Sequence, residues 1–228
     1  MAQAAAWEKE YRDPQLLSEG DEPQNDVKRF LRFLHKERDV TLSGLSILDL
    51  GSGTGRNANH LAAMGNTVVG LEIARNAVTL SQQRARALRV AVDYRAHNIG
   101  EHFPFPDDSF DVVLDVTSST SLTEGERAVY LSETARVLKS GGYFFVRALC
   151  KEGDKNAKNL IKMNPGPETD TYINQDMGLT ERVFTEADFR SHYAPYFTII
   201  SLEKKTGYAR FKGQNYKRNY WLAYVQKV

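Results

Sequence analysis

Residues 46–56, with the sequence SILDLGSGTGR, decide the fold of this chain of 228 residues. An apolar run of five residues comes first, and glycine alternates with small polar residues after it. A helix is expected over residues 57–64, so the stretch predicts a buried strand, a glycine turn and a helix. Glycine lets the backbone adopt positive φ and lets a ligand approach it closely. The first turn of the following helix favours a carboxylate or a phosphate.

The same alternation of strand and helix continues on both sides of this stretch. Further helices are predicted at residues 27–35, 74–89 and 124–139, and further strands at 67–72, 90–94, 110–116 and 143–149. Two last strands, 197–202 and 220–225, have no helix between them. The pattern predicts an α/β fold with a doubly wound, mostly parallel seven-stranded sheet and an antiparallel C-terminal edge hairpin.

The length suits a single domain over residues 1–228. Within it, residues 1–23 are expected to form an N-terminal arm or a short helix. Residues 151–183 are polar and contain Gly, Pro and Asn, which predicts an insertion that covers one end of the sheet and the substrate. Thr123 with Glu126, and Thr185 with Asp188, are helix starts.

The composition of the chain limits the ligands and macromolecules that it is expected to bind. Hydrophobic residues make up 41%, charged residues 26%, and the net charge is +1, so global charge does not favour nucleic acid or an anionic membrane. The single cysteine and the spacing of the five histidines predict no disulfide and no metal site. No apolar leader or long apolar run is present, so we expect no membrane span and a cytoplasmic location.

Glu72 ends the strand that follows the glycine turn. In a doubly wound sheet its carboxylate faces the same crevice and can accept hydrogen bonds from both hydroxyls of a ribose. An adenosine-type ligand is therefore expected. A nucleoside triphosphate would require a lysine and a Ser or Thr closing the loop, where this chain has Arg56 and Asn57. A dinucleotide would require a third glycine one residue later, at the position of Arg56.

Residues 49–55, DLGSGTG, resemble the first motif of the class I S-adenosylmethionine-dependent methyltransferases. Glu72 stands at the position of the ribose acid of that family. Residues 104–111 and 137–142 resemble its turns before the fourth and fifth strands. The resemblance covers about residues 45–149, and the final strand pair extends it to the C-terminus.

The resemblance implies S-adenosylmethionine as cofactor and assigns roles to particular residues. The glycines would hold its methionine end, Asp49 would order the loop and hold the amino group, and Ile73 would pack on adenine. Asn98 stands where the family often has an acid, and its amide can still pair with adenine. Asp115 ends the fourth strand, beside the transferring methyl group. The implied cofactor-binding residues are Asp49, Gly51, Ser52, Gly53, Gly55, Glu72, Ile73, Asn98, Ile99 and Asp115.

The implied function is methyl transfer to a small-molecule acceptor, by a monomer or a homodimer. Two alternatives stay open: an RNA or protein methyltransferase, and an oxidoreductase or non-catalytic nucleotide-binding protein. Residues 115–118 lack the D/N-P-P-aromatic pattern of base-amino methyltransferases, which argues against that subclass. No catalytic base is assigned, because only some acceptors must lose a proton.

Several residues have a structural and a functional interpretation. Trp7 and Tyr11 could close an N-terminal arm over the cofactor, but simple packing is preferred for both. Packing is also preferred for Phe103 and Phe105 over a role in a substrate cage. Asp115 could contact the cofactor or substrate directly, or it could accept hydrogen bonds from backbone N–H groups of the following loop. The basic stretch 204–218 is interpreted as a solvated loop rather than a surface for single-stranded nucleic acid. A structural role is preferred for His60 and His192, and residues 181–185 resemble a segment of small-molecule methyltransferases.

Overall fold

The computed structural model describes residues 2–13, 20–211 and 213–228. Part of the expected N-terminal arm, residues 14–19, and Lys212 of the basic stretch lie outside the described residues. The remaining part of the arm that precedes this gap forms helix α1 (Ala2–Arg12).

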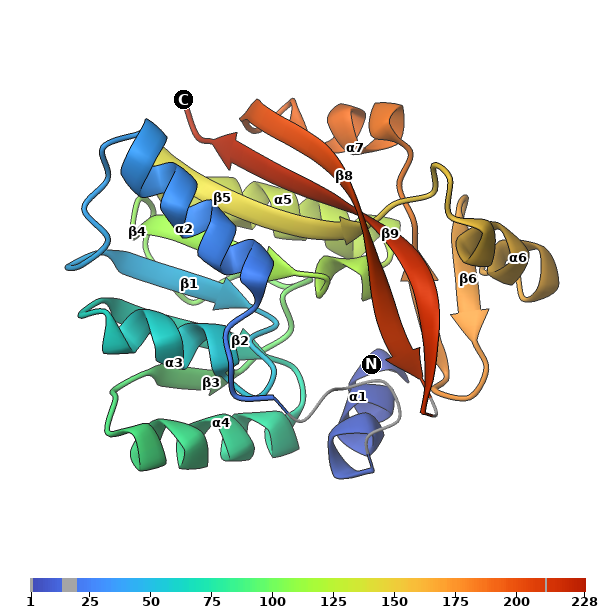
Figure 1. Ribbon diagram of the computed structural model, residues 1–228, viewed down its shortest axis with the longest axis horizontal. Helices are drawn as coiled ribbons and strands as arrows, with labels where there is room; N and C mark the ends of the chain where they lie inside the picture. The colour runs from blue at the N-terminus through green and yellow to red at the C-terminus, as the bar shows by residue number, and fades with distance from the viewer. Residues whose placement is uncertain (1, 14–19, 212) are drawn as a thin grey trace.

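One seven-stranded sheet organises the fold, in the order β3-β2-β1-β4-β5-β9-β8 (Figure 1). Its first five members are parallel, and β9 runs antiparallel to both of its neighbours. The predicted mixed sheet with an antiparallel edge hairpin is therefore confirmed. The strands are β1 (Ser46–Leu50), β2 (Thr67–Glu72), β3 (Asp93–Ala96), β4 (Phe110–Val116), β5 (Leu138–Leu149), β8 (Thr198–Phe211) and β9 (Gln214–Gln226).

Helices cover both faces of the sheet (Figure 1). Apolar side chains of α2 (Asn25–Glu37), α3 (Arg56–Ala63) and α4 (Arg75–Leu88) pack in one core cluster. Those of α5 (Glu124–Val137) and α7 (Glu186–Tyr193) pack in the other. Most of β4 is buried, as a strand covered on both faces should be.

Local sequence signals explain where the helices begin. The Thr123 hydroxyl accepts from the Glu126 N–H, and the Glu126 carboxylate accepts from the Thr123 N–H at 2.9 Å. This confirms the capping box at the start of α5. Thr185 caps α7 in the same way by accepting from the Asp188 N–H at 3.1 Å.

The interpretation of residues 204–218 as a solvated loop is wrong. The described residues of this stretch lie mainly in β8 and β9, which pair from Thr198 with Gln226 to Phe211 with Gln214, with one register shift between Ile199 and Ser201. The charged residues led to the loop interpretation, but a long hairpin can carry charged side chains without breaking its ladder, because side chains project out of the plane of the backbone hydrogen bonds. Gly213, with φ of 77°, supplies the turn. The expected strand 90–94 is also shifted, to 93–96.

Residues 151–183 contain structure of their own. They form α6 (Lys155–Met163) and a separate two-stranded antiparallel sheet of β6 (Thr171–Asn174) and β7 (Leu179–Arg182). A 3-10 turn, η1 (Ser119–Ser121), follows β4. Among the described residues, no helix has both the length and the apolar character needed to cross a membrane.

Candidate active site

The glycines after β1 occupy positions that no other residue could take without strain. Gly51, Gly53 and Gly55 have φ of 65°, 55° and 85°. A Cβ on Gly51 would lie 2.2 Å from Ser118 Cβ, and one on Gly55 would lie 2.2 Å from the Tyr94 hydroxyl. The loop is therefore held close to its neighbours, with its backbone facing the carboxyl edge of the sheet.

Glu72 connects this loop to the next strand. Its Oε2 accepts from the Gly53 N–H at 3.0 Å, and its Oε1 accepts from the Ala74 N–H at 2.9 Å. Burial raises the pKa of the Glu72 carboxyl, and the backbone hydrogen bonds oppose that rise. Each carboxylate oxygen has a further lone pair, so both can still accept from a ligand hydroxyl.

Asp49 is a buried carboxyl with an unused acceptor. Its side chain is 2% exposed, and Oδ2 has no hydrogen-bond partner among the described residues. Burial, followed by the negative charges of Asp115 and Glu72, raises the pKa of Asp49 to about 7. The buried hydroxyl of Ser52 also lacks a partner there. A cationic ligand group would meet the electrostatic requirement of Asp49, because an unpaired buried charge is costly.

A cleft of about 1450 Å³ opens beside these residues. It runs from the glycine loop to the β8–β9 hairpin and is bordered by α1 and α6. The structure brings most of the expected cofactor residues together on its wall, namely Asp49, Gly51, Ser52, Gly53, Glu72, Ile73, Asn98 and Ile99.

Asp115 and Gly55 do not line the cleft, which corrects their expected placement. Asp115 is fully buried, and its carboxylate accepts from the Ser118 N–H at 2.8 Å and from the Tyr130 hydroxyl at 2.6 Å. It therefore orders the loop after β4, the alternative that the sequence left open. Gly55 is the left-handed residue before α3, packed against Tyr94.

Asn98 lies at the edge of the cleft, and its amide is partly engaged. Its Oδ1 accepts from the Gly100 N–H at 2.9 Å, and its Nδ2 is 3.3 Å from a Glu101 carboxylate oxygen. The amide also hydrogen-bonds the Glu126 carboxylate, and its carbonyl oxygen keeps a second lone pair for a ligand.

The N-terminal helix closes the cleft on one side, contrary to the preference for simple packing at Trp7 and Tyr11. Both side chains line the cleft, and a Cβ on Gly53 would lie 2.8 Å from the Tyr11 hydroxyl. Burial raises the pKa of Tyr11 well above its usual value. Glu8 anchors the helix, because its carboxylate accepts from the Arg75 and Asn76 N–H groups at 2.5 and 3.2 Å. These are the first amides of α4, where a carboxylate is favourable.

Sequence reasoning assigned no site role to several other residues that line the cleft. Arg56 lines the cleft, is half-buried and makes no hydrogen bond or ion pair with another described residue. Thr117, after β4, has φ of 68°, a strained value for a β-branched residue. Alternation along β9 was the available signal for the hairpin. It places Tyr216, Arg218 and Tyr220 on one face, and all three line the cleft.

Phe103, Phe105, His60 and His192 lie outside the cleft, as their preferred structural roles predict. Phe103 is fully buried in the core, and Phe105 packs against that core, as preferred from the sequence. His192 Nε2 lies 2.7 Å from Glu124, outside the cleft. His60, in α3, also does not line the cleft.

Comparison with known proteins agrees with this geometry. Residues 48–146 match the family model described as a methyltransferase domain. A structure of a S-adenosylmethionine-dependent methyltransferase from Methanosarcina mazei superposes with a TM-score of 0.75, at 21% identity, over 91% of this chain and 99% of that one. The family match covers less than half of this chain, and the superposition shows that almost the whole chain shares the fold of that methyltransferase.

Two further proteins resemble this chain over part or all of its length. The ubiquinone biosynthesis O-methyltransferase of Rhizobium etli is 31% identical over 108 residues, which are 47% of this chain and 42% of the relative. The match thus spans less than half of that relative. The 1,6-didemethyltoxoflavin-N1-methyltransferase of Burkholderia thailandensis, solved with that compound and S-adenosylhomocysteine, has a TM-score of 0.71 at 15% identity. That superposition covers 100% of this chain and 88% of the other.

Proposed function

We propose that this chain transfers a methyl group from S-adenosylmethionine to a small-molecule acceptor. The observation that carries the proposal is the pair of buried carboxylates, Asp49 and Glu72, with free acceptor capacity on either side of the glycine loop. One suits the ammonium group of the methionine end of the cofactor, and the other suits the ribose diol of its adenosyl part.

The other residues on the wall fit the same ligand. Ile73 and Ile99 offer apolar surface for adenine, and the Asn98 amide can pair with its edge. Arg56, at the start of α3 and without a partner in the described chain, can take the methionine carboxylate.

The bound sulfonium supplies an activated methyl group, so the protein needs chiefly to align the acceptor. Thr117, Ser118 and Ser121 form the wall of the cleft next to Gly51. Helix α1 reduces the access of water on one side through Trp7 and Tyr11. Alignment of this kind can contribute several kcal/mol to the barrier reduction.

Small-molecule specificity is supported by the walls of the cleft and by the relatives. We propose that α1 and residues 151–183 cover the acceptor, since Asn156, Leu160 and Tyr172 line the end of the cleft away from the glycine loop. The matched relative is named for ubiquinone biosynthesis, and one structural neighbour holds 1,6-didemethyltoxoflavin.

Titration calorimetry with S-adenosylhomocysteine tests the cofactor assignment. Wild-type protein should bind this product, and NADH should not compete. Glu72→Gln keeps the size of the side chain but removes its charge, so the affinity should fall by about 10- to 100-fold. Glu22→Gln, at an exposed residue outside the cleft, is the matched control. Equal affinity of Glu72→Gln and wild type, or preferential binding of NADH, would contradict the proposal.

A further inference from the structure

Arg147 lies on the acceptor side of the cleft, next to the expected position of methyl transfer. It is near the carboxyl end of β5, opposite Val116 of β4, and its carbonyl accepts from the Thr117 N–H at 2.8 Å. Strand β4 separates β5 from β1 and its glycine loop. Two strand spacings are roughly 10 Å, so Arg147 stands beyond the loop that would hold the cofactor.

The guanidinium of Arg147 is fixed in place but has free donors. Its side chain is 17% exposed, and the guanidinium carbon lies 3.6 Å from the centroid of the Tyr220 ring. Its buried Nε has no hydrogen-bond partner among the described residues, and neither terminal nitrogen donates to another described residue. The plane of the guanidinium is thus set by stacking while its N–H groups remain available.

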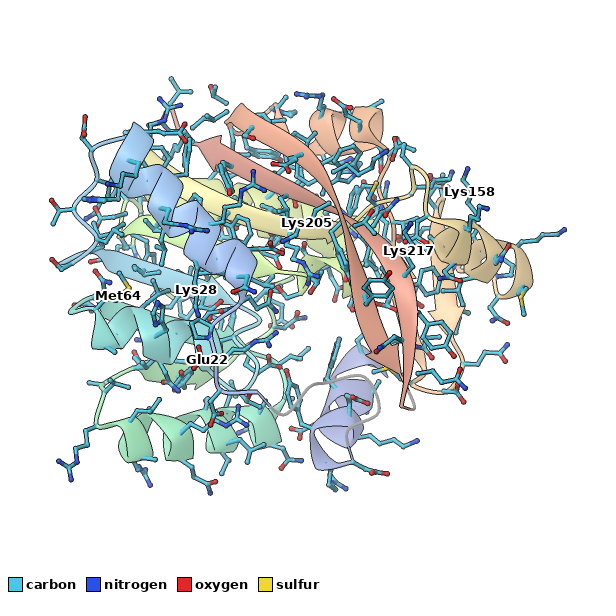
Figure 2. The ribbon with its side chains drawn as sticks, viewed as in Figure 1. Glu22, Lys28, Met64, Lys158, Lys205 and Lys217 are labelled. Atoms are coloured by element: carbon cyan, nitrogen blue, oxygen red, sulfur yellow. The ribbon has the colours of Figure 1, made fainter. Side chains whose placement is uncertain are left out.

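The nearest carboxylate does not neutralise this arginine alone. Asp26, at the start of α2, lies 3.4 Å from Arg147 Nε but without hydrogen-bond geometry. The same carboxylate also pairs with Lys205 of β8. Figure 2 shows Lys205 on the hairpin beside the beginning of α2. One negative charge therefore faces two cations. Burial, followed by the charge of Arg147, lowers the pKa of Arg56.

Apolar surface continues directly from the guanidinium. Leu149 is two residues further along β5, on the same face of the sheet, and is paired with Tyr220 of β9. Both side chains are buried and belong to one cluster with Tyr172 and the partly buried Leu160, all of which line the cleft. Arg218, a further cation on the wall of the cleft, is matched by Asp154 at 3.1 Å. Arg147 and Lys205 share the single carboxylate of Asp26, so positive charge is in excess beside this apolar floor.

We propose that Arg147 binds a carboxylate of the methyl acceptor, whose aromatic or apolar body packs on Leu149 and Tyr220. The inference rests on the proposed methyl transfer and narrows the acceptor to small apolar or aromatic carboxylic acids. A guanidinium held by stacking offers two parallel N–H groups, the geometry that matches a carboxylate. A neutral acceptor of the same shape leaves these donors without an anion.

Benzoate, phenylacetate and 4-hydroxybenzoate, compared with their uncharged amides, serve as probes. Each is titrated at neutral pH into full-length protein saturated with S-adenosylhomocysteine, by calorimetry and saturation-transfer NMR. At least one acid should bind about tenfold or more tightly than its amide. Arg147→Gln should abolish that preference. Arg147→Lys should retain only part of it, because lysine keeps the positive charge but lacks the paired N–H donors of a guanidinium. Arg95→Gln, an arginine stacked on Phe105 outside the cleft, is the matched control.

The outcomes separate this inference from the proposed function. Acids and amides that bind equally, or that all fail to bind, overturn the carboxylate site. An unchanged preference in Arg147→Gln also overturns it. Loss of S-adenosylhomocysteine binding in Arg147→Gln, with binding retained in Arg95→Gln, would instead assign Arg147 to the cofactor. Failure of the wild type to bind S-adenosylhomocysteine contradicts the proposed function itself.

Discussion

At the scale of single residues, the site combines groups that are unfavourable in the free protein. Asp49 is buried with an unpaired oxygen, and Thr117 has a left-handed backbone. Such features persist where the surrounding structure holds them, and they are concentrated at functional sites. Asp49 is the clearest case, because a bound ammonium group would supply the partner that the described chain lacks.

The raised pKa of Asp49 predicts a pH-dependent affinity for S-adenosylhomocysteine. With a pKa of about 7 in the free protein, the carboxyl is increasingly protonated at lower pH and loses its attraction for the ammonium group. The affinity should therefore be constant above pH ~8 and fall by up to about tenfold per unit below pH ~6. Calorimetry across this range, in buffers of different ionisation enthalpy, should also detect proton release on binding. A flat profile would contradict the role of Asp49.

The same shift predicts that Asp49→Asn stabilises the free protein. A carboxyl with a folded-state pKa raised above its unfolded value is destabilising when ionised. The penalty is absent below the unfolded pKa of 3.8, grows as pH rises towards about 7 and is complete above that value. Urea unfolding should show Asp49→Asn more stable than wild type by up to about 4 kcal/mol at pH ~8, and much less at pH ~4. Asp13→Asn, at an exposed residue, is the control.

At the scale of elements, α1 and the β8–β9 hairpin form two walls of the cleft at the carboxyl edge of the sheet. Helix α1 is held to the sheet core largely through polar contacts, including Glu8 at the first amides of α4 and Gln3 at the Ser121 carbonyl. Few buried apolar contacts mean a low local stability. Its position over Gly53 thus depends on a small number of hydrogen bonds.

Glu8→Ala should therefore weaken cofactor binding without unfolding the domain. Without the carboxylate, the first two N–H groups of α4 hydrogen-bond only to water. The loss in free energy is about 1 kcal/mol, and most of it weakens the docking of α1. We expect S-adenosylhomocysteine to dissociate several-fold faster, measured by stopped-flow displacement. Lys9→Ala, on the exposed side of the same helix, should behave as wild type. If the two variants dissociate at the same rate, α1 does not hold the cofactor.

At the scale of the whole molecule, the cleft is lined by residues of elements from α1 to β9. A ligand there contacts the edges of several strands and both covering elements, so binding should stabilise the fold as a unit. S-adenosylhomocysteine at about 100 times Kd adds about 2.7 kcal/mol. For a chain of 228 residues this corresponds to a rise in Tm of roughly 5–10 °C.

Differential scanning calorimetry measures that shift directly. Glu72→Gln at the same ligand concentration should show much less of it, because its cofactor site is weakened. A rise in Tm that is equal in both proteins would mean that the ligand binds elsewhere.

The sequence by itself determined the parts of this protein that depend on neighbouring residues. The strand, glycine loop and helix of residues 46–63, the capping box of Thr123 and Glu126, and the position of Glu72 are all encoded within a few turns of chain. The parallel winding of the sheet followed because short crossovers between strands and helices leave little choice of topology.

Only the tertiary structure decided the direction of side chains whose partners are distant in sequence. Asp115 faces Ser118 and Tyr130 instead of the cleft because α5 brings Tyr130 beneath the end of β4. Arg147 gained its role from Tyr220 and Asp26, which lie on elements far from it in the chain. The hairpin was not predicted because a run of charged residues resembles a loop until its strand pairing is known. Local signals set the elements, and long-range packing set which of their side chains meet.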